Sequence, residues 1–146
     1  DHHITNQTTM EAHSNEINTN KVQLHFDMNS SGSKLAWKFF HGSKPIPDFI
    51  KLIDDHDLGK WKLDETHAFI SFLQYEKFEF EVYDKFFQDK KAFQNAITKG
   101  NVINQVHEKD IEKFQGTKVD NFFGYSIIIA NGSILKNQLA NALLNK

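Results

Sequence analysis

Residues 22–42 join a short alternating run to a serine-glycine turn and an amphipathic segment. The run VQLHF, from Val22 to Phe26, alternates apolar and polar residues and predicts a β-strand. In the segment DMNSSGSKLAWKFFHG that follows, Ser30 and Ser31 can cap a helix and Gly42 can end it. This segment is therefore predicted to be a strand, a turn and a helix.

The middle of the chain has helical periodicity. Pro45 and Pro47 predict the start of another helix, which leads into the acidic string DDHD. From residue 67 to about residue 116, apolar residues recur at spacings of three and four and predict helices in several pieces. Gly100 is a possible interruption of the last piece.

The two ends of the chain differ in pattern. Residues 4–20 are polar and lack an apolar period, which predicts a loop. Residues 125–130, YSIIIA, are apolar and β-branched and predict a buried strand, followed by a final helix from Ile134 to about Leu144. The predicted order is therefore β-α-α, a helical middle, and β-α.

Composition excludes several classes of protein and site. The 146 residues suffice for about one domain. The absence of cysteine excludes disulfides, zinc-thiolate sites and a cysteine nucleophile. All 17 basic residues are lysines, so a phosphate site would lack the bidentate guanidinium group, and a net charge of -2 exerts no strong attraction on nucleic acid or membranes. No apolar run approaches the ~20 residues of a membrane span. We expect an intracellular protein, in the cytoplasm or an organelle matrix.

Two polar clusters carry residues that can bind metals, the triplet Asp1-His2-His3 and the string 54–57, DDHD. Imidazole and carboxylate ligands together suit divalent metals, and two such segments side by side can hold a metal pair that activates water. A solvated chain end and an exposed helix C-terminus explain the same residues without a metal.

The order of these features resembles the DHH phosphoesterase superfamily, especially its exopolyphosphatase-like and oligoribonuclease-like branches. The resemblance rests on DHH, then SGSKLAWKFF, then LIDDHDLGKW, and covers residue 1 to about residue 61. It implies an α/β fold with a partial parallel-sheet domain in residues 1–64, a helical linker in 65–118, and the first strand and helix of the associated C-terminal domain in 119–146.

The same resemblance assigns roles to individual residues. His2 is similar to the metal ligand of the triplet, Asp1 to the carboxylate that orients this ligand, and His3 to the imidazole that contacts substrate phosphate. Asp55 matches the later metal-binding aspartate, and Asp57 is the alternative, because a slip of one or two residues is easy in an acidic string.

The implied activity is metal-dependent hydrolysis of phosphodiester or phosphoanhydride bonds. Mn²⁺ is the expected cofactor, with Mg²⁺ second, and the expected substrates are nucleotides, short oligonucleotides or polyphosphate. Ser31 and Gly32 resemble the turn that lets the backbone approach the site, although they also suit a simple helix start. The family's upstream metal-binding motifs have no counterpart in the chain, so we expect it to be inactive alone.

In a second hypothesis the chain has the family's fold but no catalytic activity. The chain would then be an inactive structural or accessory subunit of a larger assembly, with a protein partner covering the exposed sheet. Its 14 phenylalanines would serve packing and partner contact.

Overall fold

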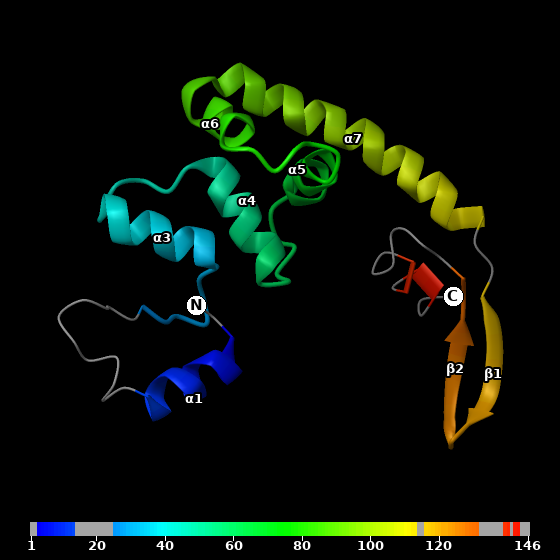
Figure 1. Ribbon diagram of the computed structural model, residues 1–146. Helices are drawn as coiled ribbons and strands as arrows, with labels where there is room; N and C mark the ends of the chain where they lie inside the picture. The colour runs from blue at the N-terminus through cyan, green and yellow to red at the C-terminus, as the bar shows by residue number, and fades with distance from the viewer. Residues whose placement is uncertain (1–2, 14–24, 114–115, 132–138, 141, 144–146) are drawn as a thin grey trace. The chain divides into compact units, whose positions relative to one another are not determined.

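The computed structural model describes residues 3–13, 25–113, 116–131, 139–140 and 142–143 (Figure 1). These residues divide into two compact units, Asp1–Asn101 and Val102–Lys146, which are treated separately below. Their helices and strands are α1 (Ile4–Ala12), α3 (Gly32–His41), α4 (Asp48–Asp57), α5 (Thr66–Leu73), α6 (Phe80–Gln88), α7 (Lys90–Lys113), β1 (Thr117–Phe122) and β2 (Tyr125–Ile129).

Helix α3 begins and ends where local sequence signals predict. The hydroxyl of its N-cap, Ser31, accepts a hydrogen bond from the backbone N–H of Lys34 at 3.3 Å. At the other end Gly42 has φ +61, a left-handed conformation that glycine adopts without strain, and its N–H bonds the Lys38 carbonyl. The predicted helix between the serines and Gly42 is confirmed.

Helix α4 follows Pro47 directly, as predicted from the prolines, and ends at Asp57. The acidic string therefore forms its last turn. Asp54 and Asp55 are buried, at 6% and 4% exposure, whereas Asp57 is exposed. Two buried carboxylates at one helix end require hydrogen-bonding partners, because an unpaired buried charge is costly.

The core of the first unit is built where α4, α5, α6 and α7 meet. Phe69 of α5 is fully buried, and its ring packs against Phe86 of α6 and Phe93 of α7, each with centroids 5.3 Å apart. At Gly100 of α7 a side-chain carbon would overlap the backbone of Ala68 in α5, so glycine permits this close approach. The buried core residues are Phe49, Ile50, Leu52, Ala68, Phe69, Ala96 and Ile97.

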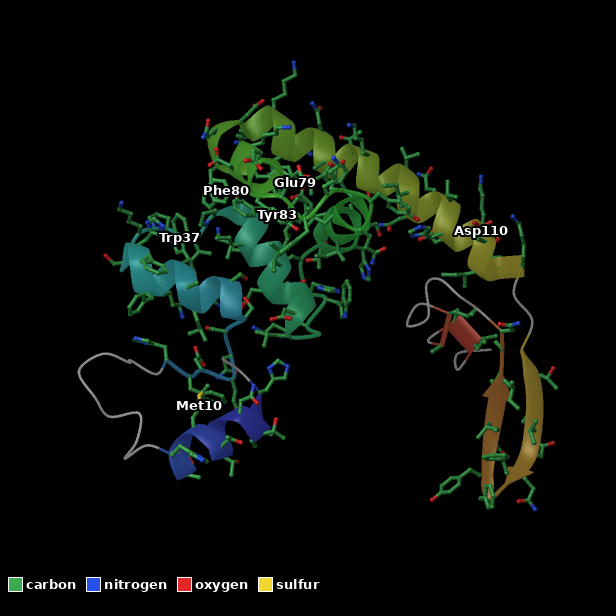
Figure 2. All side chains as sticks on the ribbon, viewed as in Figure 1. Met10, Trp37, Glu79, Phe80, Tyr83 and Asp110 are labelled. Atoms are coloured by element: carbon green, nitrogen blue, oxygen red, sulfur yellow. The ribbon has the colours of Figure 1, made fainter. Side chains whose placement is uncertain are left out.

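An apolar groove of about 600 Å³ opens beside this core, between α4, α5 and the start of α6. Glu79, Phe80 and Tyr83, labelled in Figure 2, line it on the α6 side. Phe78, which also lines the groove, is 94% exposed.

In the second unit, β1 and β2 form an antiparallel hairpin (Figure 1). The turn is Phe123-Gly124, and both residues have positive φ, as the tight turns of hairpins require. The pairing is irregular between Val119 and Phe122. Tyr125, Ile128 and Ile129 are largely exposed.

The predicted α/β fold with a partial parallel sheet is wrong. Within the described ranges the structure is mostly helical, and its sheet consists of two antiparallel strands. The predicted strand at 22–26 is not formed at His25 and Phe26, and residues 22–24 lie outside the described part. The strand at 125–129 exists, but it is mostly exposed rather than buried. It belongs to an antiparallel hairpin, which does not need cover on both faces as a parallel sheet does. The final predicted helix lies mostly outside the described residues.

Two local predictions in the helical regions also fail. Residues 4–12, predicted as a loop, form α1, in which the Thr8 and Thr9 hydroxyls bond the carbonyls four residues earlier and Gln7 bonds Glu11. Helix α7 runs through Gly100 without a break. No helix in the described residues is long and apolar enough to cross a membrane, which agrees with the prediction.

Candidate functional site

Asp54 ties the end of α4 to the start of α3. One of its carboxylate oxygens accepts a hydrogen bond from the backbone N–H of Ser31 at 2.7 Å, and the other accepts one from the Lys34 ammonium at 2.9 Å. Lys60 adds a second ammonium at 3.6 Å. Because a helix N-terminus carries a partial positive charge, the carboxylate satisfies both the free amide and the dipole of α3.

A second carboxylate stabilises the serine turn before α3. Asp27 accepts hydrogen bonds from the Ser30 hydroxyl at 2.7 Å and from the Asn29 backbone N–H at 2.9 Å. Lys38, in the second turn of α3, donates to the Ser30 hydroxyl at 3.2 Å and lies 4.0 Å from the Asp27 carboxylate. We call the combined group the Asp54 cluster; its members are Asp27, Ser30, Ser31, Lys34, Lys38, Asp54 and Lys60.

The Asp54 cluster carries three lysines against two aspartates, a formal charge of +1 from this count. Burial alone raises the pKa of Asp54, but the hydrogen bonds from Ser31 and Lys34 outweigh it and lower the pKa below its ordinary value. The Ser30 hydrogen bond and the Asn29 amide lower the pKa of Asp27. Both carboxylates are therefore charged at neutral pH and form ion pairs with the three lysines.

Asp55, the next residue, bonds different partners and holds the loop after α4 in place. Its carboxylate accepts hydrogen bonds from the backbone N–H groups of Lys62 at 3.0 Å and Leu63 at 3.1 Å. The hydroxyl of Thr66, which is fully buried at the start of α5, donates a third at 2.6 Å. Asp55 thus links α4, the loop and α5.

This arrangement bears on the predicted metal site. Burial raises the pKa of Asp55, but the bonds from Thr66, Lys62 and Leu63 outweigh it and lower the pKa. An aspartate offers about four lone pairs, and three of these accept protein donors, so about one remains for a metal. In the part of the chain that the structure describes, no group of three or more possible ligands could hold a metal ion. The described residues alone therefore do not form a metal centre.

The loop that Asp55 organises presents Trp61 in an unusual conformation. Trp61 has φ +50, a left-handed conformation that is a genuine outlier for a bulky residue. Its N–H and that of Lys60 both point to the Asp55 carbonyl, at 3.4 and 2.9 Å. The indole stacks on His67, with centroids 4.2 Å apart and planes 13° apart, and meets His56 edge-on at 4.9 Å. The side chain stays 42% exposed.

Burial and neighbouring charges act on His56, one of the two histidines beside Trp61. Burial lowers the pKa of His56, the neighbouring charge of Asp57 raises it, and the charge of His67 lowers it again, with a net decrease. His56 is thus neutral at pH 7.

The predicted site residues are only partly placed together. Asp1 and His2 lie outside the described residues, and His3 is the exposed N-cap residue of α1. Asp55 and Asp57 share the last turn of α4, one buried and one exposed.

Three residues of the site lie within the quoted motifs but were given no role there. Lys34, Lys60 and Trp61 were not predicted as site residues. Lys34 could have been found locally, because it lies three residues after the cap Ser31 and so above the start of the helix. Its contact with Asp54, 20 residues away, has no such signal.

Comparison with known proteins yields one relative and no family. No protein-family model matches the chain, and no solved structure matches it. Over 90 residues, 62% of its length, the chain is 30% identical to the uncharacterized protein R106 of Acanthamoeba polyphaga mimivirus. The matched part is 20% of that protein, so the chain spans about a fifth of the length of the relative it is similar to.

Proposed function

We propose that the chain forms part of a metal-dependent phosphoesterase, similar to the DHH superfamily in its motifs. The reaction would be hydrolysis of a phosphodiester or phosphoanhydride bond in nucleotides, short oligonucleotides or polyphosphate. The observation that carries the proposal is the contact between two of the three motifs: Asp54 of LIDDHDLGKW bonds Ser31 and Lys34 of SGSKLAWKFF. The contact joins residues 23 positions apart in the sequence, and the side chains around it form a polar cluster with three lysines.

Anion binding is the part of the chemistry that the described residues support. A lysine ammonium binds phosphate as a point charge, and in the Asp54 cluster two ammonium groups lie within 3.6 Å of one carboxylate oxygen. The carboxylate of Asp54 holds the ammonium groups of Lys34 and Lys60 close together at the end of α4. Within the proposal, His3 contacts the phosphate, Asp1 orients His2, and His2 and Asp55 contribute metal ligands in the complete protein, with Mn²⁺ preferred over Mg²⁺.

The test is hydrolysis of bis(p-nitrophenyl) phosphate by the full-length gene product with Mn²⁺, Mg²⁺ or EDTA. We expect Mn²⁺-dependent hydrolysis, loss of it in EDTA, and loss in His2→Ala. Asp57→Asn, at the exposed end of the same helix turn, separates the two candidate aspartates, since it loses activity only if Asp57 rather than Asp55 is the ligand. A wild-type rate no higher than that of His2→Ala refutes the proposal.

An accessory role is the second candidate, and exposed aromatic side chains favour it. Phe40, Phe78 and Phe80 of the first unit are 76%, 94% and 77% exposed. Exposed aromatic residues are enriched where proteins contact partners. The described residues form no parallel sheet, so we do not propose a partner that covers one. Purification of the chain as a stable monomer, with no partner recovered from its host, would count against this role.

A further inference from the structure

We propose that the apolar groove of the first unit binds an alkylammonium ion, with the alkyl chain on the groove floor and the ammonium group beside Glu79. The proposal goes beyond the phosphoesterase chemistry, because the groove and the Asp54 cluster are lined by different residues. It rests on three properties of the groove, which are its apolar floor, its exposed aromatic rings and its carboxylate.

The floor of the groove is apolar and is held in place by the core. Phe49 and Ile50 of α4 line it and are themselves 5% and 6% exposed, so core packing sets their positions. Ile53 of α4 and the α5 residues Ile70 and Leu73, all half-buried, also line it. A volume of about 600 Å³ lies within the range of pockets that hold small organic molecules. The floor therefore suits an alkyl chain.

Three aromatic side chains line the groove on the α6 side. Phe78 and Phe80 are 94% and 77% exposed, so most of the surface of both rings is open to a ligand. Tyr83 lies one helical turn after Phe80, as Figure 2 shows, and its ring meets the Phe78 ring edge to face with centroids 5.7 Å apart. The face of an aromatic ring carries negative partial charge and attracts ammonium ions, and several such rings together bind quaternary ammonium ligands.

Among the described residues that line the groove, Glu79 is the charged one. It is the N-cap residue of α6, but its side chain makes no capping hydrogen bond. Its carboxylate lies 3.7 Å from the Lys77 ammonium, and because both side chains are largely exposed this ion pair is weak. A carboxylate beside open aromatic rings and an apolar floor is complementary to a cation that carries an apolar chain. An anion with the same chain would be repelled.

Isothermal titration calorimetry of the full-length protein with octyltrimethylammonium, below its micelle concentration, tests the proposal. We expect saturable binding with a dissociation constant on the order of 0.1–1 mM. Hexyltrimethylammonium should bind roughly 10-fold more weakly, because each methylene group buried in the groove strengthens binding roughly three- to fourfold. Octyl sulfate, which replaces the cation by an anion, and tetramethylammonium, which lacks the chain, should each bind at least about 10-fold more weakly.

Variants locate the site in the groove. Glu79→Gln should weaken octyltrimethylammonium binding about 3- to 10-fold and leave the binding of octan-1-ol unchanged, because octan-1-ol has the chain without the charge. Lys77→Gln should strengthen octyltrimethylammonium binding, since it removes the competing ammonium. Phe80→Leu, which removes a ring but keeps an apolar side chain, should weaken it about 3-fold. Glu81→Gln, exposed in the first turn of α6, is the matched control and should change the affinity less than about twofold.

Three results would overturn the proposal. They are no binding of octyltrimethylammonium by the folded protein, equal affinities for octyltrimethylammonium and octyl sulfate, and equal effects of Glu79→Gln and Glu81→Gln. The urea midpoint of each variant shows whether the first unit is still folded. The titrations need neither metal nor turnover, so their outcome is independent of the hydrolysis assay that tests the proposed function.

Discussion

Removal of the Asp55 carboxylate should destabilise the first unit far more than removal of its neighbour Asp57. Asp55→Ala deletes three acceptors at once, and the Thr66 hydroxyl is then left fully buried without its bond of 2.6 Å. A hydrogen bond to a charged group contributes about 1.5–3 kcal/mol, so the loss at Thr66 is about 2 kcal/mol. The amides of Lys62 and Leu63 belong to exposed residues and can turn to water, which limits their share to about 1 kcal/mol.

The free energy of unfolding should therefore fall by about 3 kcal/mol in Asp55→Ala. With a urea dependence of about 1.5 kcal/mol per molar, the midpoint moves down by about 2 M. Both tryptophans lie in the first unit, so their fluorescence reports this unit's unfolding. Asp57→Ala, exposed on the same helix turn, should change the free energy by less than about 0.5 kcal/mol.

A double-mutant cycle separates the buried bond from the rest. Thr66→Val removes the hydroxyl and keeps the size of the side chain, so Asp55→Ala should cost less in that background, with a coupling of about 1–2 kcal/mol. If Asp55→Ala and Asp57→Ala shift the urea midpoint equally, the assignment of Asp55 as the residue that organises the loop is wrong.

Three further outcomes follow from the same structure. Gly100→Ala should lower the free energy of unfolding in urea by at least about 2 kcal/mol, because its new carbon meets the Ala68 backbone. Gly32→Ala, with open space around it, should be neutral or stabilising. Equal effects of the two variants would refute the close approach of α7 to α5. The depressed pKa of His56 means that stability is lost as pH falls from its unfolded value of 6.5 through the folded pKa, and His56→Gln should abolish this step in midpoints measured against pH. Lys34→Ala should lower stability by about 1–2 kcal/mol, less so in molar salt, and a salt-independent loss would argue against an ion pair at α3.

Local chemistry made the helix ends predictable. Ser31, Pro47 and Gly42 each act on the backbone within a few residues, so their effects can be found in the sequence itself. The same holds for the placement of DDHD at a helix end. The different partners of Asp54 and Asp55 within that string were not predictable, because these partners come from segments up to 23 residues away.

The errors came from patterns with more than one structural solution. Tyr125–Ile129 has the β-branched composition of a buried strand, yet it pairs with a preceding segment through Phe123-Gly124, a turn without the usual asparagine or aspartate. Helix α1 has no apolar face. Its side chains instead form hydrogen bonds to residues four positions away, and a search for apolar periodicity does not detect these bonds. Neither case could be decided without knowing which segments meet.

Asp54 and Asp55 point to different partners, and this fixes the number of residues in α4. Neighbours on a helix point about 100° apart, which is why adjacent carboxylates serve α3 on one side and the loop with α5 on the other. One residue inserted between Phe49 and Asp54 would turn both carboxylates by that angle relative to the core face and detach both partners together. An insertion before Pro45 would move neither. In relatives that share this architecture, we expect length differences to gather outside α4.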